Sequence, residues 1–200
     1  MIDAMRAPRL DVDLELERSI ALLPKHACVK GVYFSDVLRR ASKAEPHAEI
    51  LRRAGVAPRR WLPFFDYPYA DWMRIAVVAA QALTPEKSPA EGMRELGRHA
   101  YDTLLDTQVG RVVFGVLGTE VSDILRIGPK GYAMMVNFGS VTAEAVGASR
   151  YRYRFREFPC FLETFQVGVL EGAVRHCKAR GEATIDLHDL ANADVDIAYG

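Results

Sequence analysis

The spacing of apolar residues predicts helices over the first two thirds of the chain. Apolar positions recur every three to four residues, the period of a helix with one buried face. Three segments with this spacing are residues 30–42, 47–54 and 69–83. Gly55 closes the second segment, and Pro68 precedes the third, where a proline can open a helix. The chain therefore begins as a set of short amphipathic helices.

A fourth helix has a clear start signal. Ser88 is followed by Pro89 and, three residues after the serine, by Glu91. This spacing is typical of a capping box, in which the serine and glutamate side chains satisfy backbone N–H groups at the helix start. The helix is expected to run to about His99 and to continue towards Gly110.

Three stretches give weaker patterns. Residues 111–127 are expected to be helical with a break at Gly118, and residues 129–139 to form an irregular or extended approach to a sheet. Near the start, residues 13–23 have apolar positions among charges and predict a short helix or a loosely docked arm.

The period changes to strict alternation from residue 140 onwards. Residues 140–158 alternate on both sides of Gly147 and predict a β-hairpin, and residues 181–191 and 193–200 predict a second strand pair. Between the two pairs, the segment EFPCFLETFQVGVLEGAVRHCKARGE has helical spacing. Its helix is expected to start at Pro159 and to stop at Gly181.

This order of elements predicts an α+β fold. N-terminal helices are followed by β-β-α-β-β, which favours a four-stranded antiparallel sheet packed on helices. The expected organisation is an N-terminal arm or short helix over residues 1–29 and a single α+β domain over residues 30–200.

The helix between the strand pairs carries Gly168 and Gly172, two glycines on one face. Each costs about 0.5–1 kcal/mol relative to alanine in a helix interior, so another backbone is expected to approach closely there. Packing of this helix on the sheet is the expected reason. A dimer interface and a ligand channel are the alternatives.

The strand RYRYRFR places four arginines on one face, because side chains alternate along a strand. One interpretation is a row of guanidiniums that binds the phosphates of a nucleotide or a phospholipid headgroup, formed by Arg150, Arg152, Arg154 and Arg156. The other, favoured interpretation is a solvated face whose charges are matched across the sheet. The matching residues would be Glu144, Asp186, His188, Asp194 and Asp196.

Composition excludes several classes of protein. The chain has 26 basic and 26 acidic side chains and a formal net charge of zero, so it does not resemble a nucleic-acid-binding protein. No stretch reaches the roughly 20 apolar residues of a membrane span. The three cysteines lie far apart without paired spacing, which indicates free thiols in a reducing compartment and predicts a cytoplasmic protein.

Catalytic and metal-binding motifs are not found in the sequence. The five histidines form no ligand spacing, and no nucleophile elbow, phosphate loop or dinucleotide fingerprint occurs. Cys160 lies at the expected start of a helix, where a thiolate can be stabilised, so a cysteine-dependent enzyme is kept as an alternative. A buried structural thiol is the favoured interpretation, and no metal or catalytic residue is predicted.

Four segments carry a resemblance to a known family: KGVYFSDVLRR, YPYADWMRIAVVAAQALTP, MRELGRHAYDTLLDTQVGRVVFGVLG and FLETFQVGVLEGAV. In this order they resemble an uncharacterised paralogous family found in myxobacteria, over residues 30–200. That family is distantly similar to the ligand-binding domain of haem-NO sensors, four-vinyl-reductase-type domains and TRAPP transport subunits. The resemblance implies the same α+β order, an apolar ligand and a homodimer.

Haem is not expected, because the motifs that hold it in the haem-NO sensors are missing. Those sensors use a histidine before the sheet and a Y-x-S-x-R anchor. Residues 120–149 contain no histidine, and Tyr151-Arg152-Tyr153-Arg154-Phe155 lacks the serine and the final arginine. An apolar small molecule or a lipid is expected instead of a cofactor.

The sequence therefore predicts a non-enzymatic sensor or scaffold module that homodimerises and binds a small apolar ligand or a protein partner. Binding of anions by the arginine strand is the alternative. The predicted pocket or interface is formed by the aromatic segment 61–72 and the helix 159–178, with Trp61, Phe65, Trp72, Phe161, Phe165, Gly168, Val169 and Gly172.

Overall fold

The computed structural model describes residues 5–106 and 120–200, with the backbone alone for residues 103–106. Helices dominate its N-terminal half. The elements are α1 Leu16–Ala21, β1 Cys28–Lys30, α2 Gly31–Ala41, α3 His47–Ala54, β2 Asp66–Pro68, α4 Tyr69–Leu83 and α5 Pro89–Asp106. The predicted helices at 30–42, 47–54 and 69–83 are confirmed. The small antiparallel sheet of β1 and β2 was not predicted.

The C-terminal half contains the main sheet. Its elements are α7 Val121–Met135, β3 Ser140–Gly147, β4 Arg150–Arg156, η1 Leu162–Gln166, α8 Val167–His176, β5 Gly181–Leu187 and β6 Ala193–Tyr199. All strand pairs are antiparallel, in the order β3-β4-β6-β5. The predicted α+β class, with helices followed by β-β-α-β-β, is confirmed.

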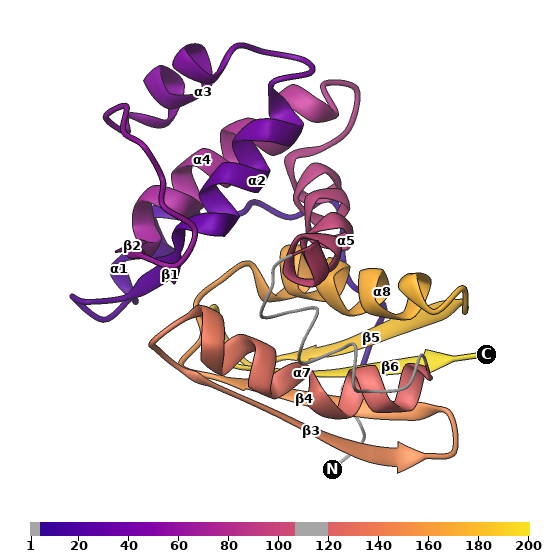
Figure 1. The fold of residues 1–200 in the computed structure, drawn as a ribbon. Helices are drawn as coiled ribbons and strands as arrows, with labels where there is room; N and C mark the ends of the chain where they lie inside the picture. The colour runs from indigo at the N-terminus through magenta and orange to yellow at the C-terminus, as the bar shows by residue number, and fades with distance from the viewer. Residues whose placement is uncertain (1–4, 107–119) are drawn as a thin grey trace.

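The helices form layers on one side of the sheet. Figure 1 shows α8 above the sheet and α5 crossing over α8, with α2, α3 and α4 further out. Helix α8 packs on β5 and β6, α7 packs on β3, and the two helices also contact each other. The inward face of β4 presents Tyr151, Tyr153 and Phe155, which are all buried. The main core therefore lies between the sheet and the α7–α8 layer.

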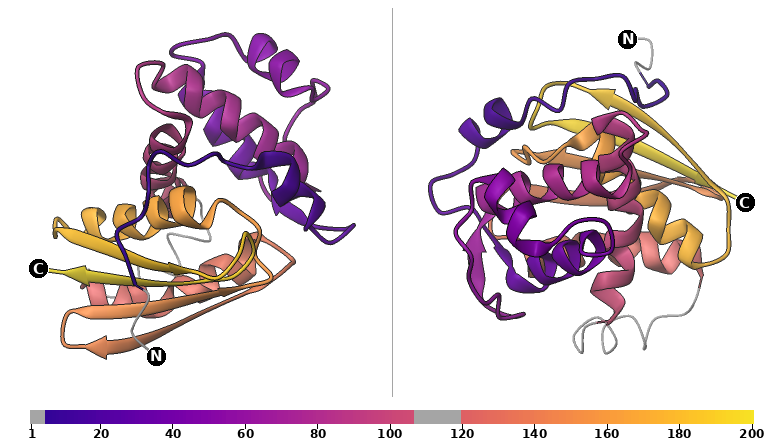
Figure 2. Two further views of the ribbon diagram at one scale, coloured as in Figure 1. Left: turned by 180° about the vertical axis from the view of Figure 1, so that it is seen from behind. Right: turned by 90° about the horizontal axis from the view of Figure 1, so that it is seen from above.

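The N-terminal arm crosses to the far edge of the sheet, as the view from behind in Figure 2 shows. Arg6 forms two backbone hydrogen bonds with Ile185 of β5. The carboxylate of Glu163 is buried, with the side chains of Arg6 and Arg9 as its partners. Burial raises the pKa of Glu163, but these arginine hydrogen bonds outweigh burial, and the net pKa is lowered. A buried ionised glutamate thus joins the arm to η1.

The predicted capping box at the start of α5 is confirmed. The backbone N–H of Glu91 donates to Ser88 Oγ at 3.2 Å, and the backbone N–H of Ser88 donates to Glu91 Oε2 at 3.0 Å. Beyond Asp106, the predicted continuation towards Gly110 lies outside the described residues, as does the part of the predicted helix 111–127 that precedes residue 120.

The prediction of an irregular or extended segment over residues 129–139 is wrong for residues 129–135, because α7 continues through Pro129 to Met135, and is confirmed for residues 136–139. A proline inside a helix cannot donate a hydrogen bond to the carbonyl four residues earlier, which here belongs to Leu125. The Tyr153 hydroxyl donates to that carbonyl instead. Gly128 permits the approach, since a Cβ there would lie 2.3 Å from the tyrosine oxygen. A contact with the sheet therefore replaces the hydrogen bond that the proline removes.

The helix predicted over 159–178 is shorter and begins differently. Phe161 has a left-handed backbone with φ of 47°, and one turn of π-helix follows before the regular helix, which ends at His176. A left-handed conformation is rare for a bulky residue, and π turns are frequent at functional sites. The wide turn places the side chains of Phe165 and Gln166 towards the interior, where both are buried.

The two glycines of α8 pack against a helix, so the expected contact with the sheet is wrong. A Cβ on Gly168 would lie 2.2 Å from the carbonyl oxygen of Arg94, and one on Gly172 would lie 2.3 Å from that of Arg98. Both carbonyls belong to α5. From the opposite side, a Cβ on Gly97 would lie 2.2 Å from the carbonyl oxygen of Phe165. The close backbone approach itself is as predicted.

We expect Gly168→Ala to lower the free energy of unfolding by about 1–3 kcal/mol, because the added methyl group forces α5 and α8 apart. Gly147→Ala is the matched control, since its Cβ would meet only the Arg150 Cβ at 3.6 Å, an ordinary contact. Urea unfolding followed by circular dichroism measures both. Equal stability of the two variants would contradict the packing described.

Candidate functional site

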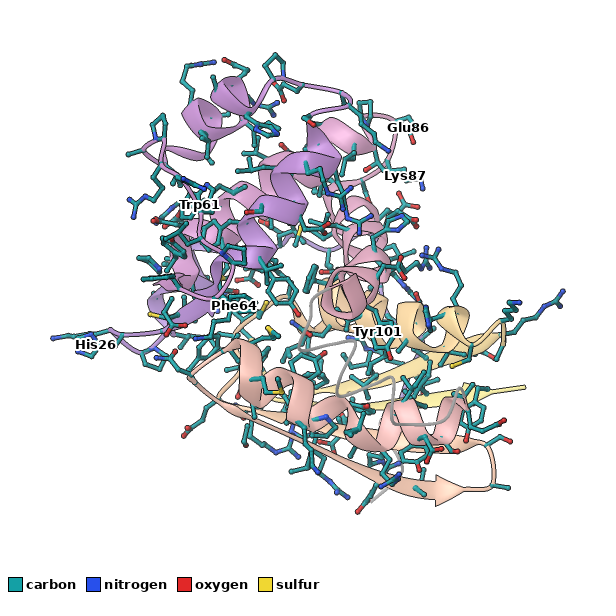
Figure 3. The ribbon with its side chains drawn as sticks, in the orientation of Figure 1. His26, Trp61, Phe64, Glu86, Lys87 and Tyr101 are labelled. Carbon is teal, nitrogen blue, oxygen red and sulfur yellow. The ribbon has the colours of Figure 1, made fainter. Side chains whose placement is uncertain are left out.

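A cavity of about 80 Å³ lies where α5, α7 and α8 meet above β4. Its walls come from elements far apart in the chain, and Figure 3 shows Tyr101 between the helical layer and the sheet. The lining is mainly apolar and aromatic, and no charged side chain is among the described residues that form it. These residues are Val29, Tyr33, Tyr69, Trp72, Ala100, Tyr101, Ile124, Gly128, Gly131, Tyr132, Met135, Val136, Tyr153, Phe158, Phe165, Gln166, Val169, Leu170 and Ala173.

Several polar atoms of the lining bind one another or the backbone. The Tyr132 hydroxyl donates to Gln166 Oε1 at 2.7 Å, and Gln166 Nε2 donates to the Cys160 carbonyl at 3.2 Å. The Tyr69 hydroxyl is hydrogen-bonded to the sulfur of Cys160. Burial holds the pKa of Tyr69 and of Tyr132 well above the ordinary value for tyrosine. These tyrosines are therefore neutral hydrogen-bonding groups over the whole physiological pH range.

Three of the predicted pocket residues line the cavity: Trp72, Phe165 and Val169. The Trp72 ring packs edge-on against Phe165, with ring centroids 5.1 Å apart. Gly168 and Gly172 do not line it, because they face α5. Their contribution is indirect, since the close approach of the two helices sets the position of the cavity wall.

The other three predicted pocket residues lie elsewhere. Trp61 is buried among the N-terminal helices, stacked on Phe34 with centroids 4.0 Å apart, and Figure 3 shows it away from Tyr101. Phe65 is 62% exposed on a loop. Phe161 is buried, but it faces a second, polar groove beside the N-terminal arm. These three residues do not line the cavity, because the aromatic residues of this segment and of the helix start point into different parts of the fold.

Sequence reasoning missed most of the tyrosines of the lining and Gln166. The five tyrosines of the lining come from five elements, α2, α4, α5, α7 and β4, and their convergence depends on tertiary contacts. Gln166 did give a signal, since it is a neutral polar residue within the otherwise apolar run FQVGVL. Its side chain is 1% exposed and both ends of its amide are hydrogen-bonded.

The arginine strand is paired with carboxylates. Arg152 binds Asp196 through two hydrogen bonds of 2.7 and 2.9 Å, and Arg150 binds the same carboxylate at 2.5 Å. The other two guanidiniums also have partners: Arg154 pairs with Glu144 and Arg156 with Asp194. The register of the sheet places these residues opposite one another. The favoured interpretation, a face whose charges are matched across the sheet, is therefore confirmed for Glu144, Asp194 and Asp196, and the pairing speaks against the alternative of an anion platform.

Cys160 does not have the properties of a catalytic nucleophile. The residue is fully buried, and burial raises the pKa of its thiol to about 12. A reactive cysteine needs a thiolate near neutral pH and access to substrate. The favoured interpretation of a buried thiol is confirmed, and the sulfur is the hydrogen-bond partner of Tyr69, a residue of the lining. Among the described residues, no group of histidine, cysteine and acidic side chains is arranged to hold a metal ion.

The chain belongs to a family described as "Protein of unknown function (DUF2378)", whose model matches residues 23–198. No curated protein matches the chain. None of the helices within the described ranges is long and apolar enough to cross a membrane.

Solved structures of H-NOX proteins share the fold. An H-NOX protein from S. oneidensis in the Fe(II)NO ligation state is 14% identical, with a TM-score of 0.66 over 86% of this chain and 99% of that one. The Fe(II) unliganded H-NOX protein from K. algicida is 12% identical, with a TM-score of 0.62 over 86% and 96%. A variant of H-NOX from T. Tengcongensis is 16% identical, with a TM-score of 0.63 over 85% and 97%. The predicted similarity to the haem-NO sensor fold is confirmed.

The residues present do not fit a haem. No histidine or cysteine is among the described lining residues, and no arginine or lysine is there to pair with propionates. The hydroxyls of Tyr69, Tyr132 and Tyr153 are engaged in hydrogen bonds, and burial raises their pKa, which opposes ligation as tyrosinate. The cavity is also smaller than the roughly 300 Å³ at which pockets for drug-sized ligands begin.

We expect Arg152→Ala to lower the free energy of unfolding by about 1–3 kcal/mol, because Asp196 is only 1% exposed and loses its two-point partner. Arg154→Ala is the matched control on the same strand. Its partner Glu144 is 48% exposed, so the expected loss is about 0–1 kcal/mol. Thermal unfolding at low and high salt separates the two. The pairing would be contradicted if Arg152→Ala were as stable as the control.

Proposed function

We propose that this protein is a non-enzymatic sensor or scaffold module that binds a small apolar ligand directly in the cavity between α5, α7, α8 and β4. The observation that carries the proposal is the lining, which is apolar, aromatic and free of charged side chains in the described residues. Apolar walls with a few fixed polar groups are typical of small-molecule sites. The fixed polar groups here are the Gln166 amide and the groups that are hydrogen-bonded to it, the Tyr132 hydroxyl and the Cys160 carbonyl.

The proposed ligand is small and binds to protein side chains, with no cofactor between them. Apolar cavities of about 150 Å³ take up benzene or xenon, and this cavity has about 80 Å³. The H-NOX proteins of the same fold include one with Fe(II)NO ligation. The side chains of this chain do not fit a haem. We therefore propose that its ligand binds directly to the protein, without iron.

The π-helical turn η1 connects the cavity with the N-terminal arm at the surface. On its inner side η1 supplies Phe165 and Gln166 to the lining. On its outer side it supplies Glu163, which binds Arg6 and Arg9 of the N-terminal arm. A ligand that shifts η1 would change the ion pairs between Glu163 and the arm. The position of the arm could then signal to a partner that the cavity is occupied.

Xenon tests the cavity. In ¹³C-methyl spectra recorded under xenon pressure, we expect saturable shifts of methyl groups in the lining of the wild type. Ala173→Leu fills the cavity and should abolish these shifts, because Ala173 is a buried lining residue on α8. Ala48→Leu is the matched control on an exposed helix position and should leave them unchanged. Equal xenon-induced shifts in the wild type and in Ala173→Leu would refute the site.

A homodimer is the second part of the proposal. Strand β3 is at the edge of the sheet and pairs only with β4 among the described strands. Its one charged residue, Glu144, is held by Arg154, so no free charge protects this edge. Unprotected edge strands pair with further strands, and a second copy of β3 in antiparallel orientation would extend the sheet.

We expect light scattering to give twice the mass of the chain for the wild type. Val146→Lys adds a charge to β3 at a residue that is 40% exposed, and should give the mass of one chain. Ala198→Lys adds the same charge to an exposed position of the inner strand β6 and should stay dimeric. If the wild type had the mass of one chain, the proposed homodimer would be rejected, and the proposal for the cavity would not be affected.

A further inference from the structure

Trp72, a residue of the cavity lining, carries a buried hydrogen-bond donor. The residue is on α4, is 2% exposed and is part of the lining. Its indole Nε1 is buried and has no hydrogen-bond acceptor in the protein. Buried tryptophan N–H groups usually have a partner, and leaving such a donor unsatisfied destabilises the fold. A residue of the lining therefore carries a donor that has no acceptor in the protein.

Other polar atoms of the lining are already engaged. Both ends of the Gln166 amide are hydrogen-bonded, the Tyr132 hydroxyl donates to that amide, and the Tyr153 hydroxyl donates to the Leu125 carbonyl. The Tyr69 hydroxyl is bonded to Cys160 sulfur. A ligand that entered this cavity would leave these bonds in place and meet the Trp72 donor.

We infer that the ligand is a compact, neutral molecule with an apolar body and a hydrogen-bond acceptor, which the Trp72 N–H binds. The apolar walls require the body, the volume limits its size, and the absence of charged side chains from the described lining excludes an ion. This inference rests on the proposed function, because it specifies the chemistry of a ligand in the same cavity.

Trp61 provides an internal comparison. Its indole N–H is also buried without an acceptor, but the residue is not part of the lining. It is stacked on Phe34, with the guanidinium of Arg59 5.3 Å from its ring centroid. A molecule that binds in the cavity should therefore affect the Trp72 N–H and leave the Trp61 N–H unchanged.

The chain has two tryptophans, so the indole N–H region of a ¹⁵N spectrum holds two signals. Trp72→Phe and Trp61→Phe assign them. The probes are acetone and isobutene, which share size and shape and differ in that acetone carries a carbonyl acceptor. We expect acetone to move the Trp72 indole proton downfield in a saturable manner and isobutene to cause no such shift. The Trp61 signal should stay in place with both.

The variants measure the hydrogen bond. The preference for acetone over isobutene should fall about two- to tenfold in Trp72→Phe, the range expected for one hydrogen bond, and stay as in the wild type in Trp61→Phe. Binding of xenon and isobutene with no shift of the Trp72 signal by acetone would overturn the inference and keep the proposed cavity. Failure of all three probes to bind would overturn both. The indole shift is read on the wild type, so it decides even if Trp72→Phe does not fold.

Discussion

The close contact between the backbones of α5 and α8 determines the geometry of the rest of the molecule. Gly168 and Gly172 let α8 approach the carbonyls of Arg94 and Arg98 on α5, and Gly97 lets α5 approach the carbonyl of Phe165 on η1. The side chains that flank this contact, Arg94 and Arg98, bind Glu171 and fix the helices in register. Because α8 also packs on the sheet, this contact holds the whole N-terminal helical layer over β4 and creates the space that becomes the cavity.

The sheet and its helices are coupled through polar contacts inside an apolar core. Tyr153 replaces the hydrogen bond that Pro129 removes from α7, which ties that helix to β4. Tyr132 reaches from the same helix to Gln166 on η1. A buried polar network of this kind specifies one arrangement, since any shift leaves a donor or acceptor unsatisfied. The same bonds engage the side chains of Tyr132, Tyr153 and Gln166 in the wall, whereas the Trp72 N–H has no acceptor in the protein.

The fold is shared with H-NOX proteins, but the interior differs in its chemistry. Tyrosines, a glutamine and a tryptophan converge where a haem would need an axial ligand and cationic partners. The helical layer over the sheet thus provides the space, and the side chains decide what fits it.

Sequence alone determined the class of fold, most helix boundaries and the strand pairs, because the period of apolar residues and capping signals such as Ser88 and Glu91 are local. It also foresaw a backbone contact at Gly168 and included Trp72, Phe165 and Val169 among the pocket residues. Tertiary structure decided that the contact partner is α5, that α7 continues through Pro129, and that Trp61, Phe65 and Phe161 lie outside the cavity. These outcomes depend on residues distant in the chain, such as Tyr153 opposite Leu125, whose meeting no local pattern encodes.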